Sequence, residues 1–127
     1  MTGAKTQASA RQPSPVFVRT YDFLLWLVPR TLGFPRSQRG VLARKLQEQA
    51  FALHEALVDA AKEESAGLPP APYLRRADAA LANLRTYTRM SRELHLITPQ
   101  QYEHAARMLA EIGRLLGGWI KKTHGKL

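Results

Sequence analysis

Apolar side chains recur at steps of three and four residues along most of this sequence, and this periodicity is the feature that most limits its fold. The pattern is clearest in the last third of the chain, at Tyr102, Ala105, Leu109, Ile112, Leu116 and Trp119. Such spacing places the apolar side chains on one face of an α-helix, whereas no window alternates with the period of two that a β-strand requires. The sequence therefore predicts an all-α protein.

Three further segments have the same helical spacing, and turn-forming residues separate them. The positions that follow this spacing are Phe17, Tyr21, Leu24, Leu25 and Val28 in the first, Leu42, Leu46, Gln49, Ala50, Leu53 and Leu57 in the second, and Leu74, Ala77, Leu81, Leu84, Thr88, Ser91 and Leu94 in the third. Gly33 and Pro35 interrupt the pattern first, and the proline-rich segment 67–72 interrupts it again. Four amphipathic helices with short connections favour an up-down antiparallel four-helix bundle.

Prolines and hydroxyl residues indicate where these helices begin and end. Pro15 suits a first helical position with Ser14 as its cap, and Pro29 is expected to end or kink the first helix. Thr98 and Gln101 have the spacing of a capping box, in which each side chain binds the other residue's backbone N–H. The last helix is therefore expected to begin directly after Thr98.

The chain of 127 residues has the usual size of a single domain. Residues 1–14 carry almost no large apolar side chain and are expected to form a flexible tail, with the bundle at 15–123 and a short C-terminal tail at 124–127. The sequence contains no cysteine, which suits a reducing compartment. No apolar run approaches the roughly 20 residues that cross a bilayer, so we expect a cytoplasmic protein rather than a secreted or transmembrane one.

The sequence is strongly basic, with 19 Lys and Arg against 10 Asp and Glu, a net charge of +9 and a pI of about 10.5. Such a charge attracts polyanions, although it does not by itself separate RNA, DNA, acidic protein and anionic membrane. Segments 71–97 and 98–127 each contain five basic and two acidic residues, so each has a net charge of +3. The excess charge is therefore concentrated in the last two helices.

Arginines of the third helix follow its apolar stripe one residue further along, so they form a basic stripe beside the core. Acidic partners are few on this helix: Asp78 is expected to serve Arg75 and Arg76, and Glu93 can meet Arg89 only in the less favourable order. We interpret the stripe as a candidate site for nucleic acid or a partner. The alternative is a solvated face on which the aliphatic parts of the arginine side chains cover the core. The candidate residues on this helix are Arg75, Arg76, Arg85, Arg89 and Arg92.

The second helix carries basic residues in its first half and acidic residues in its second half. This polarity opposes the helix dipole and costs up to about 1 kcal/mol for each terminal charge, so helix stability does not explain it. A binding partner for the basic end is the simpler explanation. The candidate residues there are Arg36, Arg39, Arg44 and Lys45.

The sequence offers no pattern that indicates catalysis, a metal or a cofactor. The four histidines stand far apart, and none has the Glu-x-x-His spacing of metal sites in helical bundles. No glycine-rich loop of the kind that binds phosphate follows a strand. We therefore expect a non-enzymatic protein without metal or cofactor.

Glycines and tryptophans indicate close packing or self-assembly. Gly113 and Gly117 lie one turn apart in the stripe that continues to Trp119, which suggests a close helix contact within or between subunits; the alternative is that the helix ends at Gly117. The run 23–28 is apolar around the whole helix, so Trp26 is expected to face solvent or another chain, unless a bulkier part of the core buries it. Oligomerisation is the interpretation that we favour.

Several segments resemble the accessory variability determinant (Avd) of diversity-generating retroelements. They are Tyr21-Asp22-Phe23-Leu24, Phe34-Pro35-Arg36-Ser37-Gln38-Arg39, Ala79-Ala80-Leu81-Ala82-Asn83-Leu84-Arg85 and Glu111-Ile112-Gly113-Arg114-Leu115-Leu116-Gly117-Gly118-Trp119-Ile120. The resemblance extends from about Val16 to Lys122, and the closing glycine-tryptophan motif is its most specific part. A looser similarity connects the chain with other four-helix-bundle proteins, including those encoded in ribosomal RNA intervening sequences.

The resemblance implies a basic four-helix protomer that assembles into a homopentameric ring. It also implies binding to the retroelement's reverse transcriptase and to RNA or cDNA during mutagenic copying of a template repeat. Arg85 and Arg89 match a pair of basic positions that the family uses for partner binding. The looser similarity implies the alternative of a structural bundle protein associated with the ribosome or another RNA.

Overall fold

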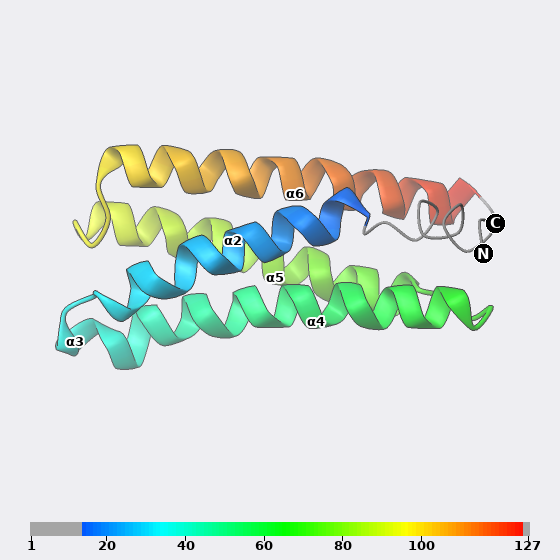
Figure 1. Ribbon diagram of the computed structural model, residues 1–127, viewed down its shortest axis with the longest axis horizontal. Helices are drawn as coiled ribbons and strands as arrows, with labels where there is room; N and C mark the ends of the chain where they lie inside the picture. The colour runs from blue at the N-terminus through cyan, green and yellow to red at the C-terminus, as the bar shows by residue number, and fades with distance from the viewer. Residues whose placement is uncertain (1–13, 126–127) are drawn as a thin grey trace, which may run out of the picture.

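The computed structural model describes residues 14–125, and this part of the chain folds into an all-α bundle of four long helices (Figure 1). These helices are α2 (Pro15–Leu32), α4 (Arg44–Ser65), α5 (Ala71–Glu93) and α6 (Pro99–Gly125). A short helix, α3 (Arg36–Gln38), and a π-helical turn, η1 (Arg39–Ala43), connect α2 to α4. The all-α fold predicted from the periodicity is confirmed, whereas residues 1–13 of the expected tail lie outside the described residues.

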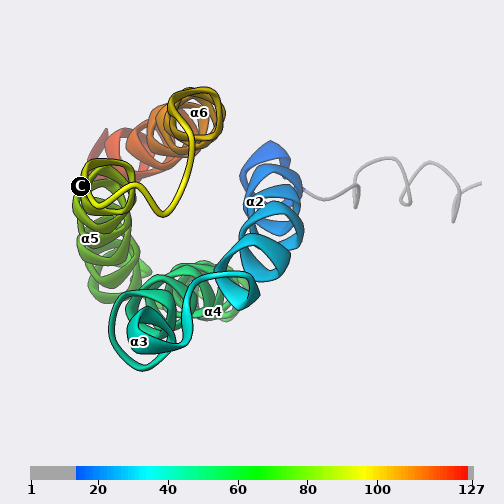
Figure 2. The same cartoon turned by 90° about the vertical axis from the view of Figure 1, so that its left-hand side faces the viewer.

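Each long helix packs against two others, so that α2, α4, α5 and α6 follow one another around the bundle axis (Figure 2). Because each connection is short, consecutive helices run in opposite directions. The interior is built mainly from leucine, and its fully buried side chains include Phe23, Leu46, Leu53, Leu57, Leu81, Leu84, Leu109, Ile112 and Leu116. Most of these positions belong to the stripes that the sequence predicted for the last three helices.

The face that α2 buries differs from the predicted one. Tyr21 and Leu25, which were expected in the core, are each 58% exposed, and the buried positions are Val16, Thr20, Phe23, Leu27 and Thr31. The two threonines are tolerated in the core because the hydroxyl of Thr20 donates to the Val16 carbonyl at 2.7 Å and that of Thr31 donates to the carbonyls of Leu27 and Val28. Apolar residues surround this helix, so its sequence is compatible with more than one buried face. The face that is buried contains two threonines, which a search for apolar residues does not select.

The ends of the helices agree in part with the sequence signals. The capping box at α6 is confirmed, since the Gln101 N–H donates to Thr98 Oγ1 at 3.0 Å and the Thr98 N–H donates to Gln101 Oε1 at 2.9 Å. Pro15 is the first residue of α2, but the side chain of Ser14 makes no capping hydrogen bond with any residue that the structure describes. Pro29 does not end α2, which continues to Leu32.

Two helices end in the same type of turn, with one residue in the left-handed region. After α4 this residue is Gly67 (φ 78°), and the Leu68 N–H donates to the Glu63 carbonyl at 2.8 Å. After α5 it is His95 (φ 61°), although the surrounding backbone hydrogen bonds are equivalent. A histidine therefore occupies a position that ordinarily favours glycine.

No helix within residues 14–125 is both long enough and apolar enough to cross a membrane.

Candidate functional site

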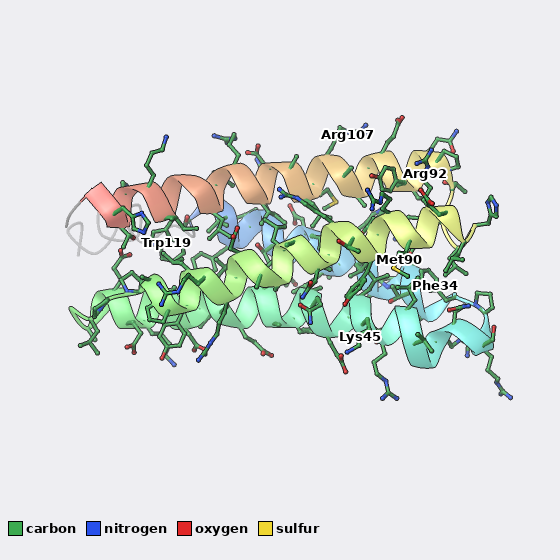
Figure 3. All side chains as sticks on the ribbon, turned by 180° about the vertical axis from the view of Figure 1, so that it is seen from behind. Phe34, Lys45, Met90, Arg92, Arg107 and Trp119 are labelled. Atoms are coloured by element: carbon green, nitrogen blue, oxygen red, sulfur yellow. The ribbon has the colours of Figure 1, made fainter. Side chains whose placement is uncertain are left out.

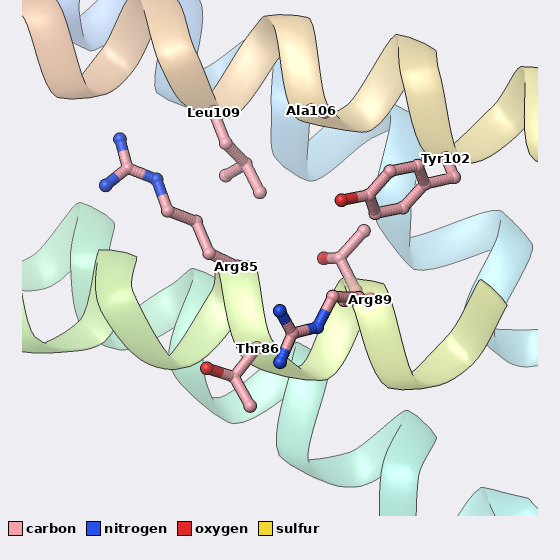
Figure 4. Close-up of a pocket in the computed structure, with 7 residues that line it drawn as sticks. Arg85, Thr86, Arg89, Tyr102, Ala106 and Leu109 are labelled. Atoms are coloured by element: carbon pink, nitrogen blue, oxygen red, sulfur yellow. The ribbon is translucent and has the colours of Figure 1, made fainter. Parts of the chain in front are cut away.

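Arg85 and Arg89 of α5 both border a pocket of about 270 Å³ between α5 and α6. Figure 4 shows their guanidiniums directed away from each other, that of Arg85 toward α6 and that of Arg89 away from it. Both arginines are exposed, and they are one helical turn apart. Tyr102, from the first turn of α6, extends over the pocket with its hydroxyl directed into it, and Ala106 and Leu109 form the apolar wall. The pocket thus combines two cations with a small apolar surface.

No carboxylate neutralises these two arginines within the described residues. In residues 14–125 the cation–carboxylate contacts within 4.0 Å are Lys45 with Glu48 and Arg114 with Glu111. The possible pairing of Glu93 with Arg89 is therefore not made. The pairing of Asp78 with Arg75 and Arg76 was expected from the sequence and is wrong, because a helix neighbour at suitable spacing gains too little from a solvated ion pair to hold both side chains together.

Gly113 of α6 allows Arg85 to lie across that helix. A methyl group added to Gly113 would overlap Nη2 of Arg85 and would lie 3.4 Å from Cδ2 of Leu81. The close contact predicted at Gly113 is thus filled by an arginine of the same chain. In the described part of the chain, nothing lies within 4 Å of the corresponding position on Gly117. Helix α6 continues through Gly117 to Gly125, so the alternative that the helix ends at Gly117 is wrong.

Arg92 has a different environment from Arg85 and Arg89. Its guanidinium lies over the ring of Tyr102, 5.2 Å from the ring centroid. A cation in this position is attracted by the face of the ring and restricts its movement. The sequence grouped the three arginines as one stripe, but in the structure Arg92 supports the tyrosine of the pocket that the other two border.

The basic residues of the second predicted helix are divided among three elements. Arg36 belongs to α3 and Arg39 to η1, where its Nε donates to the Phe34 carbonyl at 2.8 Å and fixes the turn. Arg44 and Lys45 begin α4, and Lys45 lies 3.8 Å from Glu48. All four side chains are exposed.

The four basic residues of α3, η1 and α4 lie at the end of the bundle where α5 ends. They are on the opposite side of α5 from the pocket. Figure 3 shows Lys45 and Arg92 toward the same end, with Trp119 toward the other. The α4 side of α5 is marked by Asn83, whose Nδ2 donates to Gln49 Oε1 at 3.0 Å. Both basic groups are exposed, as the sequence predicted. The sequence could not indicate that the basic residues of α3, η1 and α4 lie on the other side of α5 from Arg85 and Arg89.

Arg75 and Arg76 lie in the first two turns of α5, near the end of the bundle that holds Trp119. Arg76 is positioned over the ring of Tyr73, 5.1 Å from its centroid. The structure does not bring this pair together with Arg85 and Arg89.

Both tryptophans make contacts within the chain. Trp26 is half-buried, with its ring 5.4 Å from that of His104 and 6.3 Å from that of Phe23. Trp119 is also half-buried; its ring lies 6.2 Å from Phe17, and its Nε1 donates to Glu64 Oε2 at 3.4 Å. Both indoles thus pack between helices of one protomer.

The outer face of α2 carries exposed apolar side chains, which helical periodicity alone does not distinguish from core positions. They are Val18, Tyr21, Leu25 and Leu32, all exposed. Their spacing places them along one side of the helix, and we call them the α2 outer stripe. Because the sequence does not determine which face of α2 is buried, it does not predict that these four residues are exposed.

The remaining charged contacts are on the solvated side of α6. Arg114 donates two hydrogen bonds to Glu111, at 3.0 and 2.7 Å. These bonds lower the pKa of the Glu111 carboxyl and raise the pKa of the Arg114 guanidinium. Glu103 and Arg107, four residues apart on the same helix, make no such pair within the described residues.

Taken together, the fold and the site define a class: a basic four-helix bundle whose third long helix presents, beside a small pocket, arginines that have no carboxylate partner in residues 14–125. The model of the bAvd-like family matches residues 16–123, which includes almost the whole bundle, and the chain belongs to this family. The resemblance to Avd found in the sequence is confirmed, and at the family level the protein is an Avd-type accessory protein. Proteins of this family have a structural accessory role and do not form a known enzyme class. No curated protein matches the sequence.

Proposed function

We propose that this protein is a non-enzymatic accessory subunit of a diversity-generating retroelement, which binds the reverse transcriptase and the template RNA or its cDNA and supports mutagenic reverse transcription. The observation that carries the proposal is the pair Arg85 and Arg89. Both are exposed, and neither has a carboxylate within 4.0 Å in residues 14–125. A pair of guanidiniums free of carboxylates is suited to phosphate groups or to acidic side chains of a partner.

Contacts to nucleic acid are expected to be mainly with phosphate. Arginines that meet the backbone fix the position of a strand without reading its sequence, and each contact displaces condensed counterions. Binding by this surface should therefore be tolerant of sequence and should weaken steeply as salt increases.

Self-assembly into a homopentameric ring is part of the proposal, and the α2 outer stripe supports it. Tyr21 and Leu25 are each 58% exposed, and Leu32 is 62% exposed. Aligned apolar side chains of this size on a helix surface are typical of a protein interface. We propose this stripe, rather than Trp26, as the main apolar contribution of α2 to contacts between subunits.

A reconstituted reaction tests the proposal. Purified reverse transcriptase, template RNA and this protein are combined, and cDNA yield and substitution frequency are measured by sequencing. The variant that combines Arg85→Ala with Arg89→Ala is expected to reduce both the yield and the co-elution of the protein with the transcriptase.

The matched control combines Arg107→Ala with Arg114→Ala, which removes the same charge from the solvated side of α6. This control should leave the reaction close to that of the wild type. Equal yields with and without the protein, together with a monomer in light scattering, would favour the alternative of a structural bundle protein associated with the ribosome or another RNA.

A further inference from the structure

The pocket between α5 and α6 has features that a general basic surface does not require. Its volume of about 270 Å³ is several times the roughly 30 Å³ that one water molecule occupies, and it is close to the lower limit of small-ligand sites. Among residues 14–125, no acidic side chain lines it. It offers room for one phosphate group with part of an attached sugar or base.

The polar groups around the pocket match a phosphate. The hydroxyl of Tyr102 enters from α6, and Arg85 and Arg89 border the pocket from α5 (Figure 4). Their guanidiniums point away from each other, but both side chains are exposed and long enough to turn toward a phosphate in the pocket. Guanidiniums bind phosphate oxygens through paired hydrogen bonds, and hydroxyl groups can donate to the remaining oxygens.

Thr88 places a buried hydroxyl residue beside the pocket. The other buried hydroxyl residues, Thr20, Thr31 and Ser91, each donate to the carbonyl four residues earlier. Thr88 is only 3% exposed and lines the pocket, yet its Oγ1 has no hydrogen-bond partner among the described residues. A buried hydroxyl in this state is costly, and rotation of the side chain toward the pocket would let a bound phosphate accept its hydrogen bond.

Two further contacts hold the site in place. Arg92 lies over the ring of Tyr102, and Gly113 leaves the space in which Arg85 crosses α6. The remaining wall, Ala106 and Leu109, is apolar and suits the less polar part of a nucleotide. The small side chain of Ala106 keeps this space open.

We propose that this pocket binds the phosphate group of a single nucleotide, with Arg85 and Arg89 as its charged ligands. The nucleotide is either free in solution or one unit of a bound strand; the second source rests on the function proposed above. In both cases the pocket recognises a phosphorylated nucleoside more strongly than the same nucleoside without phosphate.

Calorimetric titration of the full chain with AMP, adenosine and inorganic phosphate tests the inference. AMP is expected to bind at least tenfold more tightly than adenosine, because charge-assisted hydrogen bonds to phosphate are worth at least this factor. Equal binding of AMP and adenosine, or no binding of AMP at millimolar concentration, would overturn the inference.

Two small-to-large variants separate the pocket from the basic surface around it. Ala106→Leu fills the pocket and keeps every charge, so the affinity for AMP should fall at least tenfold. Ala110→Leu, one turn further along α6 and exposed, is the control and should bind AMP like the wild type. Wild-type affinity in Ala106→Leu would contradict the inference. Arg89→Gln, an exposed position that leaves the core intact, should reduce AMP binding to the level of adenosine.

A competition experiment identifies the source of the nucleotide. Displacement of a labelled single-stranded RNA by AMP would place a unit of the strand in the pocket, whereas AMP binding without displacement would support a free nucleotide as the ligand. If RNA binds and AMP does not, the pocket inference fails while the proposed function stands. If AMP binds and RNA does not, the pocket inference stands without the RNA-binding part of that function.

Discussion

Replacing Gly113 with alanine should stabilise the protein less than the same replacement at Gly117. Both glycines lie inside α6, where alanine is favoured over glycine by about 1 kcal/mol. At Gly117 the new methyl group meets nothing within 4 Å, so the full gain is expected. At Gly113 it overlaps Nη2 of Arg85, and the arginine must leave the surface of α6.

The cost of moving Arg85 sets the size of the difference. The side chain is exposed and forms no ion pair within residues 14–125, so it can adopt another conformation at a cost of about 0.5–1 kcal/mol. The net gain from Gly113→Ala is therefore expected to lie between about 0 and 0.5 kcal/mol.

A double-mutant cycle in urea isolates this contact. Gly113→Ala is measured in the wild type and in Arg85→Ala, with Gly117→Ala as the control in both backgrounds and the protein concentration held constant. Without the guanidinium, Gly113→Ala should give the full gain of about 1 kcal/mol, whereas the control should be the same in both backgrounds. A gain from Gly113→Ala that does not depend on Arg85 would refute the placement of this side chain over α6.

Three further changes test the fold and the assembly. His95→Gly should raise the free energy of unfolding by about 1 kcal/mol in urea titrations, because glycine adopts the left-handed conformation at no steric cost; a loss of stability would contradict the turn described here. Thr98→Ala should lower it by about 1 kcal/mol, since the capping box of α6 loses its side-chain acceptor, and Thr98→Ser should restore most of that loss. Leu25→Lys should convert the assembled protein into smaller species in light scattering, whereas Arg19→Lys on the same helix should not; an unchanged particle mass would remove the α2 outer stripe from the interface.

The sequence predicted those parts of the fold in which one local signal had no competitor. The α6 stripe contained a single apolar face, so Ala105, Leu109, Ile112 and Leu116 were placed correctly in the core. In α2 the apolar residues surround the helix, and burial is decided by which face meets α4 and α6. Thr20 became a core residue because its hydroxyl is satisfied by the helix backbone, and periodicity alone does not express this.

The candidate site was predictable as a set of charges but not as a site. The spacing of Arg85 and Arg89 indicated a stripe beside the seam of α5, and both are exposed there. The pocket depends on Tyr102 and Ala106 from α6, and their position opposite the arginines is set by tertiary packing. One sequence signal could have indicated the pocket: the small residue Ala106 lies one turn after Tyr102 and leaves space beside the tyrosine ring.

The salt dependence of RNA binding tests the central role of Arg85 and Arg89 most directly. For a single-stranded RNA, each phosphate contact contributes about 0.7 to the slope of log K against log salt concentration. Arg85→Ala combined with Arg89→Ala should therefore reduce the slope by about 1.4, while Arg107→Ala combined with Arg114→Ala should change it much less. A slope equal to that of the wild type in the first variant would contradict the account, because the two arginines would then not contact phosphate.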